Sequence, residues 1–277
     1  MDTVYTITTL ARRELREARR GRWFWLFTAA FAALALALAW FGATGLGLQG
    51  LSGFRRTGAS LVNVILLIIP LMGLALGALS LAGERERGTL LYLLAQPIGR
   101  MELIAGKFIG LLLAMLTTLV LGFGLSGLII AWQGGAMQAG DYVSLVALSV
   151  LLSAVSLSLG LLISALSGKT TTAVGVALFL WLLLVFFGDL GLMGTALVLR
   201  LQISELFTLA LANPLQLFKM AAILLIRGDL EVLGPAGVYA IRTYGAGLLP
   251  VLLTLLLAWL VLPLNLTYLA FRKRGAL

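Results

Sequence analysis

Six long stretches of this chain contain no Asp, Glu, Lys or Arg, and short charged segments separate them. A helix needs about 20 residues to cross the roughly 30 Å hydrocarbon core of a bilayer, and each stretch supplies about that length. Thr170 to Gly188 is the tightest fit. The pattern predicts six transmembrane helices, at residues 23–46, 58–83, 107–132, 142–167, 171–190 and 247–270.

The composition indicates an integral membrane protein. Of the 277 residues, 61% are hydrophobic and 11% are charged, and the mean hydropathy is +1.08. Soluble enzyme domains do not have this balance, and six spans leave room only for short connections. The predicted fold is therefore an all-α integral membrane protein without a separate soluble domain.

The basic residues predict which side of the membrane each end of the chain occupies. The chain has 20 Lys and Arg residues against 11 Asp and Glu, and segments rich in Lys and Arg remain in the cytoplasm. If the N-terminus is cytoplasmic, six spans return the C-terminus to the same side, and most basic residues then lie inside. The outside would hold Arg55, Arg56, Arg200, Lys219, Arg227 and Arg242. Both termini are therefore predicted to be cytoplasmic.

Residues 1–22 are predicted to form a cytoplasmic amphipathic helix that lies in the membrane interface. Apolar residues recur at near-helical spacing, and charged residues such as Arg12, Arg13 and Glu14 occupy much of the rest. This pattern is typical of interfacial helices that contact membrane lipid. A basic flank that only fixes the topology is the alternative interpretation.

The segment 84–106, within the membrane unit of residues 23–188, is charged and contains a short apolar run, Thr89-Leu-Leu-Tyr-Leu-Leu94. The run is too short to cross a bilayer. It predicts a short helix on the cytoplasmic face that ends at Pro97 and Gly99. Exposed Leu and Tyr side chains between charges are what a helix offers to a cleft on another protein.

The longest connection, residues 189–246, is predicted to be an extracytoplasmic loop with one or two short helices. The helices would break at Asn213-Pro214 and at Gly228-Asp229. Asp189 is the acidic residue closest to the membrane interior, which makes it a functional candidate. The alternative is that Asp189 pairs with a loop cation such as Lys219. Residues 247–277 would complete the chain with the sixth span and a cytoplasmic tail.

The residue types needed for catalysis or metal binding are scarce. The chain has no Cys and no His, so thiolate chemistry and the commonest transition-metal ligand are missing. Ser167-Gly168-Lys169-Thr170 is similar to the end of a phosphate-binding loop, but Ile163 stands where that loop requires Gly. We expect no catalytic residue, no metal site and no nucleic-acid binding in this chain.

Two segments give the chain a resemblance to a known family. They are Ala11-Arg-Arg-Glu-Leu-Arg16 and the stretch from Gly83 to Lys107, which contains Glu84-x-x-x-Gly88-Thr89-Leu90, then Pro97-x-x-Arg100, then Gly106-Lys107. With these motifs the chain resembles the ABC-2 type permeases, whose architecture is that of type V exporters. Leu166 to Lys169, Trp181, Gly188 to Leu190 and Asn213-Pro214 are similar to the NosY branch, the permeases of nitrous-oxide reductase maturation.

The resemblance implies a homodimer that binds two copies of a separate cytoplasmic ABC ATPase in the bacterial inner membrane. ATP and Mg would be bound by the ATPase, and this chain would hold no cofactor. A periplasmic accessory protein would meet the outer face, where Asp189, Asn213 and Pro214 would lie, and the system would help to assemble a copper-sulfur centre. The resemblance assigns ATPase docking to Glu84, Arg87, Gly88, Thr89, Leu90, Leu91, Pro97 and Arg100.

Other functions remain open on the sequence. A generic ABC-2 exporter of a drug, lipid or ion would have the same pattern of spans and the same docking segment. A membrane anchor that does not transport would use the segment around Leu90 to Leu94 to bind a protein other than an ATPase. A secondary transporter would need paired charges or broken helices at mid-span, and neither is evident in the sequence.

Overall fold

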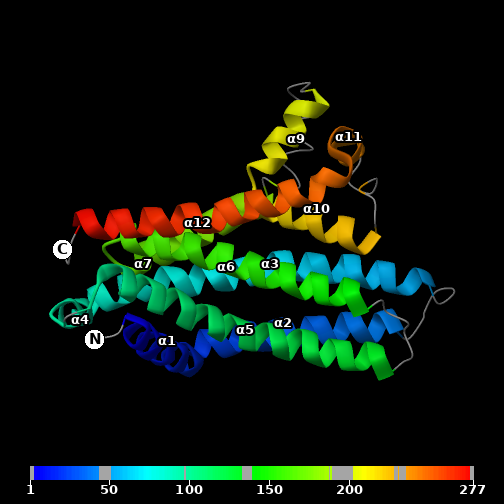
Figure 1. The fold of residues 1–277 in the computed structure, drawn as a ribbon. Helices are drawn as coiled ribbons and strands as arrows, with labels where there is room; N and C mark the ends of the chain where they lie inside the picture. The colour runs from blue at the N-terminus through cyan, green and yellow to red at the C-terminus, as the bar shows by residue number, and fades with distance from the viewer. Residues whose placement is uncertain are drawn as a thin grey trace.

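The structure is a computed structural model, and it describes residues 3–43, 51–96, 98–132, 139–186, 188, 202–227, 230 and 235–274. Long helices lie side by side along one axis: α2 (Arg22–Ala43), α3 (Leu51–Glu86), α5 (Arg100–Trp132), α6 (Ala139–Leu166), α7 (Thr170–Phe186) and α12 (Leu248–Arg274). Figure 1 shows them as one bundle. The fold is all-α, as the sequence predicts.

α3 and α6 form the centre of the bundle. Their most apolar 18-residue windows are 61% and 72% buried, whereas those of α2 and the last span are 28% and 22% buried. Small residues allow the close approach. A Cβ on Gly77 would lie 2.8 Å from the Cα of Gly160, and one on Gly73 would lie 2.8 Å from the Cβ of Ser156.

Within the described residues, five helical segments are long and apolar enough to cross a membrane, and a sixth exists if the bent pair α9–α10 counts as one span. α7 has 17 residues and is apolar throughout, but it is shorter than the predicted span of 171–190, and residues 187 and 189–201 lie outside the described residues. It lies beside α3 in the position of the predicted fifth span. We therefore treat α7 as a span.

Two spans continue into the charged segment that we predicted to lie between them. α3 extends to Glu86 and α5 begins at Arg100, whereas the sequence placed the boundaries at residues 83 and 107. Glu, Arg and Lys are good helix formers, and their charges find partners at this end of the bundle. The helices at this end therefore extend beyond the charge-free stretches of the sequence.

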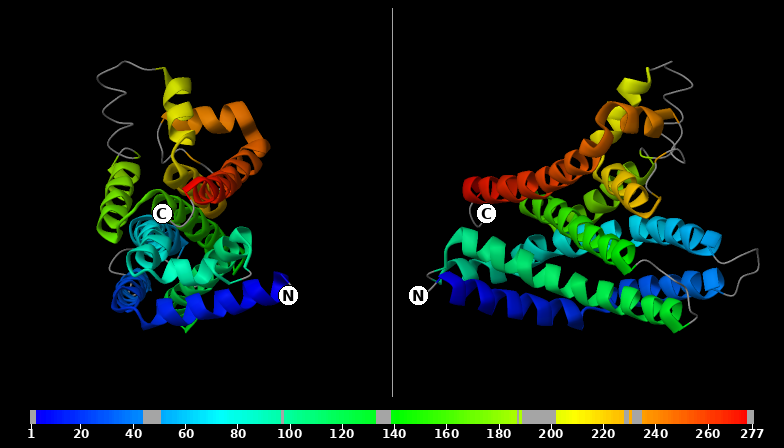
Figure 2. Two further views of the ribbon diagram at one scale, coloured as in Figure 1. Left: turned by 90° about the vertical axis from the view of Figure 1, so that its left-hand side faces the viewer. Right: turned by 45° about the vertical axis from the view of Figure 1, so that its right-hand side comes forward.

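α1 (Thr3–Arg20) lies across the spans and not parallel to them. Figure 2 shows the bundle end-on with α1 extended beneath it, separated from α2 by Gly21. The buried side of α1 packs on α5, because Gly106 and Gly110 have no side chains there. A Cβ on Gly106 would lie 2.6 Å from the Cβ of Leu10, and one on Gly110 would lie 2.5 Å from the carbonyl oxygen of Ala11.

The connection before the last span folds into the short helices α9 (Ile203–Leu211), α10 (Pro214–Arg227) and α11 (Pro235–Tyr244), followed by a 3₁₀ turn at Gly245–Gly247. α9 and α10 meet at 105°, and the break falls at Asn213-Pro214, as predicted. The prediction of one or two helices is wrong, because α11 is a third helix, and the other predicted break, at Gly228-Asp229, lies outside the described residues. These helices lie at the end of the bundle opposite α4 (Thr89–Leu94).

Candidate functional site

The short helix α4 follows α3 after a sharp turn at Gly88. The amide of Gly88 donates to the carbonyl of Arg85 (3.1 Å), and its φ of 72° lies in the left-handed region that disfavours any side chain. The hydroxyl of Thr89 then donates to the carbonyl of Glu84 (3.2 Å). The Gly-Thr pair of the motif therefore reverses the chain and starts α4.

α4 has one buried side and one exposed side. Leu90 and Leu93 are 1% and 9% exposed and pack in a small apolar cluster with residues from α1, α3, α5, α6 and α12. On the other side, Leu91 is 59% exposed and Tyr92 is 79% exposed. The helix is thus fixed to its own bundle by one side and presents a Leu-Tyr pair on the other.

Some of the predicted docking residues lie inside the chain. Leu90 belongs to the core at this end, and Glu84 is 2% exposed, so neither can contact a partner in this arrangement. Arg87 and Leu91 are exposed. Six residues cover less than two turns, so the sequence pattern could not tell which side of α4 faces outward. Pro97 lies outside the described residues.

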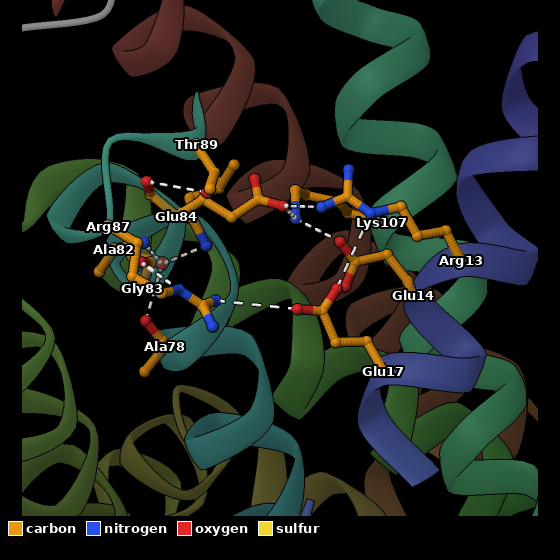
Figure 3. Close-up of polar contacts among 12 residues, drawn as sticks. Arg13, Glu14, Glu17, Ala78, Ala82, Gly83, Glu84, Arg87, Thr89 and Lys107 are labelled. Atoms are coloured by element: carbon orange, nitrogen blue, oxygen red, sulfur yellow. Dashed lines mark hydrogen bonds and ion pairs between the residues drawn. The ribbon is translucent and has the colours of Figure 1, made fainter. Parts of the chain in front are cut away.

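A charged cluster lies behind α4, where α1, α3 and α5 meet (Figure 3). The ammonium of Lys107 on α5 donates a hydrogen bond to the carboxylate of Glu14 on α1, and it lies 3.0 Å from a carboxylate oxygen of Glu84 on α3. All three residues are buried. A buried charge without its partner is strongly destabilising, so this contact fixes the three helices relative to one another.

More exposed residues complete the cluster. Arg13 lies 3.6 Å from Glu84, and Glu17 lies 3.9 Å from both Arg13 and Arg87. We call these side chains the Lys107 cluster, which comprises Arg13, Glu14, Glu17, Glu84, Arg87 and Lys107. Three acids face three bases, so the cluster is balanced. Through Arg87 it reaches the turn that precedes α4.

The two buried acids of the cluster are held in different ways. Burial raises the pKa of Glu14 above its ordinary value of 4.5, and the charge and hydrogen bond of Lys107 oppose this increase. Glu84 lies close to Lys107, but neither of its carboxylate oxygens accepts a well-aligned hydrogen bond among the described residues. Glu84 is therefore held by its ion pairs with Lys107 and Arg13.

The sequence named Arg12, Arg13 and Glu14 as residues of the interfacial helix, and the structure separates their positions. Glu14 is buried against α5, Arg13 is half-exposed at the edge of the Lys107 cluster, and Arg12 is exposed on the far side. Sequence reasoning missed the pairing of Glu14 with Lys107. The spacing of Gly106 and Gly110, one helical turn apart, is the sequence signal for a close helix approach at this place.

A serine on α6 contacts the end of α3 one turn before Glu84. The Oγ of Ser164 accepts hydrogen bonds from the amides of Leu81 (2.9 Å) and Ala82 (2.8 Å) and donates one to the carbonyl of Ala78 (2.7 Å). Nearby, Arg85 donates to the carbonyl of Ser167. The centre of the bundle is thus connected to the helix end that carries α4.

The last span also reaches this end. Arg100, at the start of α5, donates from Nη1 to the carbonyl of Arg272 near the end of α12 (3.0 Å). The carboxylate of Glu102 accepts from the amide of Gly99 (3.1 Å), which caps the start of α5. Arg100 is exposed, and in this structure it joins two helices of the chain.

The predicted outer residues lie at the opposite end of the bundle. The side-chain amide of Asn213 donates to the carbonyl of Leu184 on α7 (2.7 Å), and its Oδ1 accepts from the amide of Leu215 (2.9 Å). Asn213 therefore caps α10 and ties it to α7, and Pro214 occupies the first helical position, where its missing amide is tolerated. Asp189 and its proposed pairing with Lys219 lie outside the described residues.

Comparison with known proteins identifies the family. A family model described as "ABC-2 family transporter protein" matches residues 8–276. Two curated relatives are named "Probable ABC transporter permease protein NosY". The one from Pseudomonas aeruginosa is 35% identical over 222 residues, which cover 77% of this chain and 80% of the relative. The one from Stutzerimonas stutzeri is 31% identical over 274 residues, which cover 97% and 98%. This chain therefore belongs to the ABC-2 transporter family, as a NosY-like permease subunit.

Proposed function

We propose that α4 is the docking helix for a separate cytoplasmic ABC ATPase, which binds the ATP and Mg. The exposed pair Leu91 and Tyr92 is the observation that carries this proposal. A single exposed turn with a large apolar and an aromatic side chain suits a cleft on another protein. These two residues and Arg87 would contact the ATPase, and the buried Leu90 and Glu84 would not.

The permease works as a homodimer with two ATPase copies in the bacterial inner membrane, with both termini in the cytoplasm. α4, the start of α1 and the end of α12 lie at one end of the bundle, which supports this topology. The excess of Lys and Arg in the segments at this end also supports a cytoplasmic position for it. In this topology α4 would lie on the side where ATP is available.

Movement of α4 passes into the membrane through contacts that already exist. α4 is joined to α3 by the turn at Gly88, and α3 is joined to α1 and α5 by the Lys107 cluster. Ser164 adds α6. A displacement of α4 toward or away from the membrane therefore acts on several helices together, which is what conversion of ATPase movement into rearrangement of the spans requires.

Within this family we favour a role in the maturation of the copper-sulfur centre of nitrous-oxide reductase. The names of the two relatives and their coverage support it. A chain without Cys or His is poorly suited to carry copper ions. Transport of a sulfur species, or transmission of a conformational change to a periplasmic protein, fits the chain better. α9 and α11, which expose Ile203, Leu209 and Tyr244, would form the surface that meets this protein, whereas α10 and the Asn213-Pro214 break are mostly buried.

Affinity purification of the tagged full-length chain from its host membranes tests the docking proposal. The wild type should recover an ABC ATPase, and Leu91→Glu should reduce that recovery by at least about tenfold, because burying an unpaired charge costs several kcal/mol. Met101→Glu is the matched control, since Met101 is 56% exposed at the same end of the bundle but lies on α5.

Each result has a clear meaning for the proposal. Loss of ATPase from Leu91→Glu alone supports docking through α4. Equal loss from both variants, or no loss from either, overturns it. Recovery of an ATPase without a periplasmic protein would favour a generic ABC-2 exporter, and recovery of no ATPase by the wild type would favour the membrane anchor. Copper uptake by vesicles that contain only this permease and its ATPase would contradict the choice of cargo.

A further inference from the structure

One side of α1 forms an open groove that the docking proposal does not use. Its lining consists of Tyr5, Thr8, Thr9, Arg12, Arg13 and Arg16. This side faces away from Leu10, Ala11 and Glu14, which pack on α5. Side chains on a helix lean toward its N-terminus, so Arg12 leans toward the shorter Thr8 and Thr9 of the preceding turn.

The groove offers hydrogen-bond donors with positive charge. Among the described residues, Arg12 and Arg16 take part in no ion pair, whereas Arg13 lies near Glu17 and Glu84. The hydroxyls of Thr8 and Thr9 both donate to the carbonyl of Tyr5 (2.9 and 2.8 Å), so they are not donors to a ligand. Two guanidinium groups one helical turn apart therefore define the site, and their planar donors match phosphate oxygens.

The groove lies at the level where a bilayer has its headgroups. α1 crosses the spans at their end, and the chain enters α2 directly after it with Trp23 and Trp25, which are 64% and 50% exposed. The indole of Trp25 donates to the carbonyl of Arg19 (2.8 Å). Exposed tryptophans at the end of a span mark the membrane-water interface.

An apolar border distinguishes this groove from a site for a soluble anion. Val4 is 72% exposed, and it lies one helical turn from Thr8 on the edge of the groove. Leu15, two turns further along the same edge, is half-buried. A ligand in the groove would therefore meet positive charge and apolar side chains together, as the phosphate and acyl chains of a lipid do.

We propose that Arg12 and Arg16 bind the phosphate of an anionic phospholipid of the inner leaflet. The lipid would hold α1 flat against the membrane and so keep Glu14 beside Lys107. This site is distinct from the ATPase-docking surface, because it uses the side of α1 that faces away from α5. It also does not depend on the ATPase, so the two proposals can fail separately.

Native mass spectrometry of the purified full-length chain in detergent tests the site. The probes are dioleoylphosphatidylglycerol and, as the zwitterionic control, dioleoylphosphatidylcholine. Arg12→Gln/Arg16→Gln should weaken binding of the anionic lipid by at least about tenfold, because it removes the charge-assisted hydrogen bonds from two guanidinium groups to the phosphate. Arg19→Gln/Arg20→Gln removes the same charge from exposed residues of α1 outside the groove and should leave binding near the wild-type level.

Each alternative ligand has its own result. Equal weakening in both double variants would mean diffuse attraction by the basic helix and would overturn the site. Displacement of the lipid by millimolar inorganic phosphate would assign the groove to a soluble anion. Wild-type lipid binding by Arg12→Gln/Arg16→Gln, with loss of the co-purified ATPase, would assign the groove to an acidic protein surface. Monodisperse elution in size-exclusion chromatography shows that a variant is folded. A change in lipid binding by a folded variant can then be assigned to the substituted arginines.

Discussion

The hydroxyl of Ser164 on α6 lies 2.7 Å from the carbonyl oxygen of Ala78 on α3 and also contacts the amides of the next turn. It accepts from Leu81 and Ala82 while it donates to Ala78, so its full hydrogen-bonding capacity is used. Ser164 therefore ties α6 to the backbone of α3 just before Glu84 and α4.

Replacement of Ser164 should weaken the fold and the connection to α4. Ser164→Ala removes the acceptor of two buried amides, and we expect a loss of about 1–3 kcal/mol in the free energy of unfolding. Ser149→Ala is the control, because the buried hydroxyl of Ser149 donates only to the carbonyl of Leu145 in its own helix (2.7 Å). Thermal unfolding in detergent compares them. Equal unfolding temperatures for the two variants would contradict the role assigned to Ser164.

The Lys107 cluster gives a second prediction. Lys107→Met leaves Glu14 and Glu84 buried without their shared cation, and we expect a loss of about 3–5 kcal/mol. Addition of Glu14→Gln and Glu84→Gln to this variant should recover much of the loss, because no buried charge then remains among the three residues. Lys169→Met, which removes an exposed lysine, is the control. Thermal unfolding is the measurement, and a triple variant no more stable than Lys107→Met would contradict the argument.

Glu14 gives a pH dependence of known sign. Burial raises the pKa of Glu14 above 4.5, so the folded protein binds this proton more tightly than the unfolded chain does. The stabilisation that the proton gives is fully present below pH 4.5 and is lost as the pH rises through the folded pKa. The unfolding temperature of the wild type should therefore fall, relative to that of Glu14→Gln, as the pH increases from 4.5. A rise over the same range would contradict this prediction.

The sequence predicted the spans because membrane insertion depends on composition over a length of about 20 residues. It also predicted the α4 helix and the break at Asn213-Pro214, because apolar runs and Pro are local signals. The same signals could not give the additional helix α11 or the extension of α3 and α5 past their apolar stretches. Those features depend on partners elsewhere in the chain.

The sequence predicted which segment forms the candidate site, but not which of its side chains are exposed. The motif located the segment, but burial of Leu90 depends on residues such as Phe271, far along the chain. The pairing of Glu14 with Lys107 joins residues 93 positions apart and follows from the packing of α1 on α5. The Gly106-x-x-x-Gly110 spacing is a local signal for close helix packing. It does not identify α1 as the helix that packs there.

The close approach of α1 to α5 gives a last prediction. A Cβ on Gly110 would lie 2.5 Å from the carbonyl oxygen of Ala11 and 2.6 Å from the Cβ of Glu14, so Gly110→Ala must push α1 away from α5. We expect a loss of about 1–3 kcal/mol from this overpacking, although Ala is the better helix former by roughly 1 kcal/mol. Displacement of α1 would also separate Glu14 from Lys107.

Gly124→Ala on the same helix is the control, because no atom lies within 4 Å of the Cβ that it would add. It should be neutral or slightly stabilising. Amide hydrogen exchange of α1 in the detergent-solubilised protein separates the two substitutions, since exchange should become faster in Gly110→Ala and stay at the wild-type rate in Gly124→Ala. Unchanged protection of α1 in Gly110→Ala would mean that α1 is not held by this contact, and the Lys107 cluster would then have to form without it.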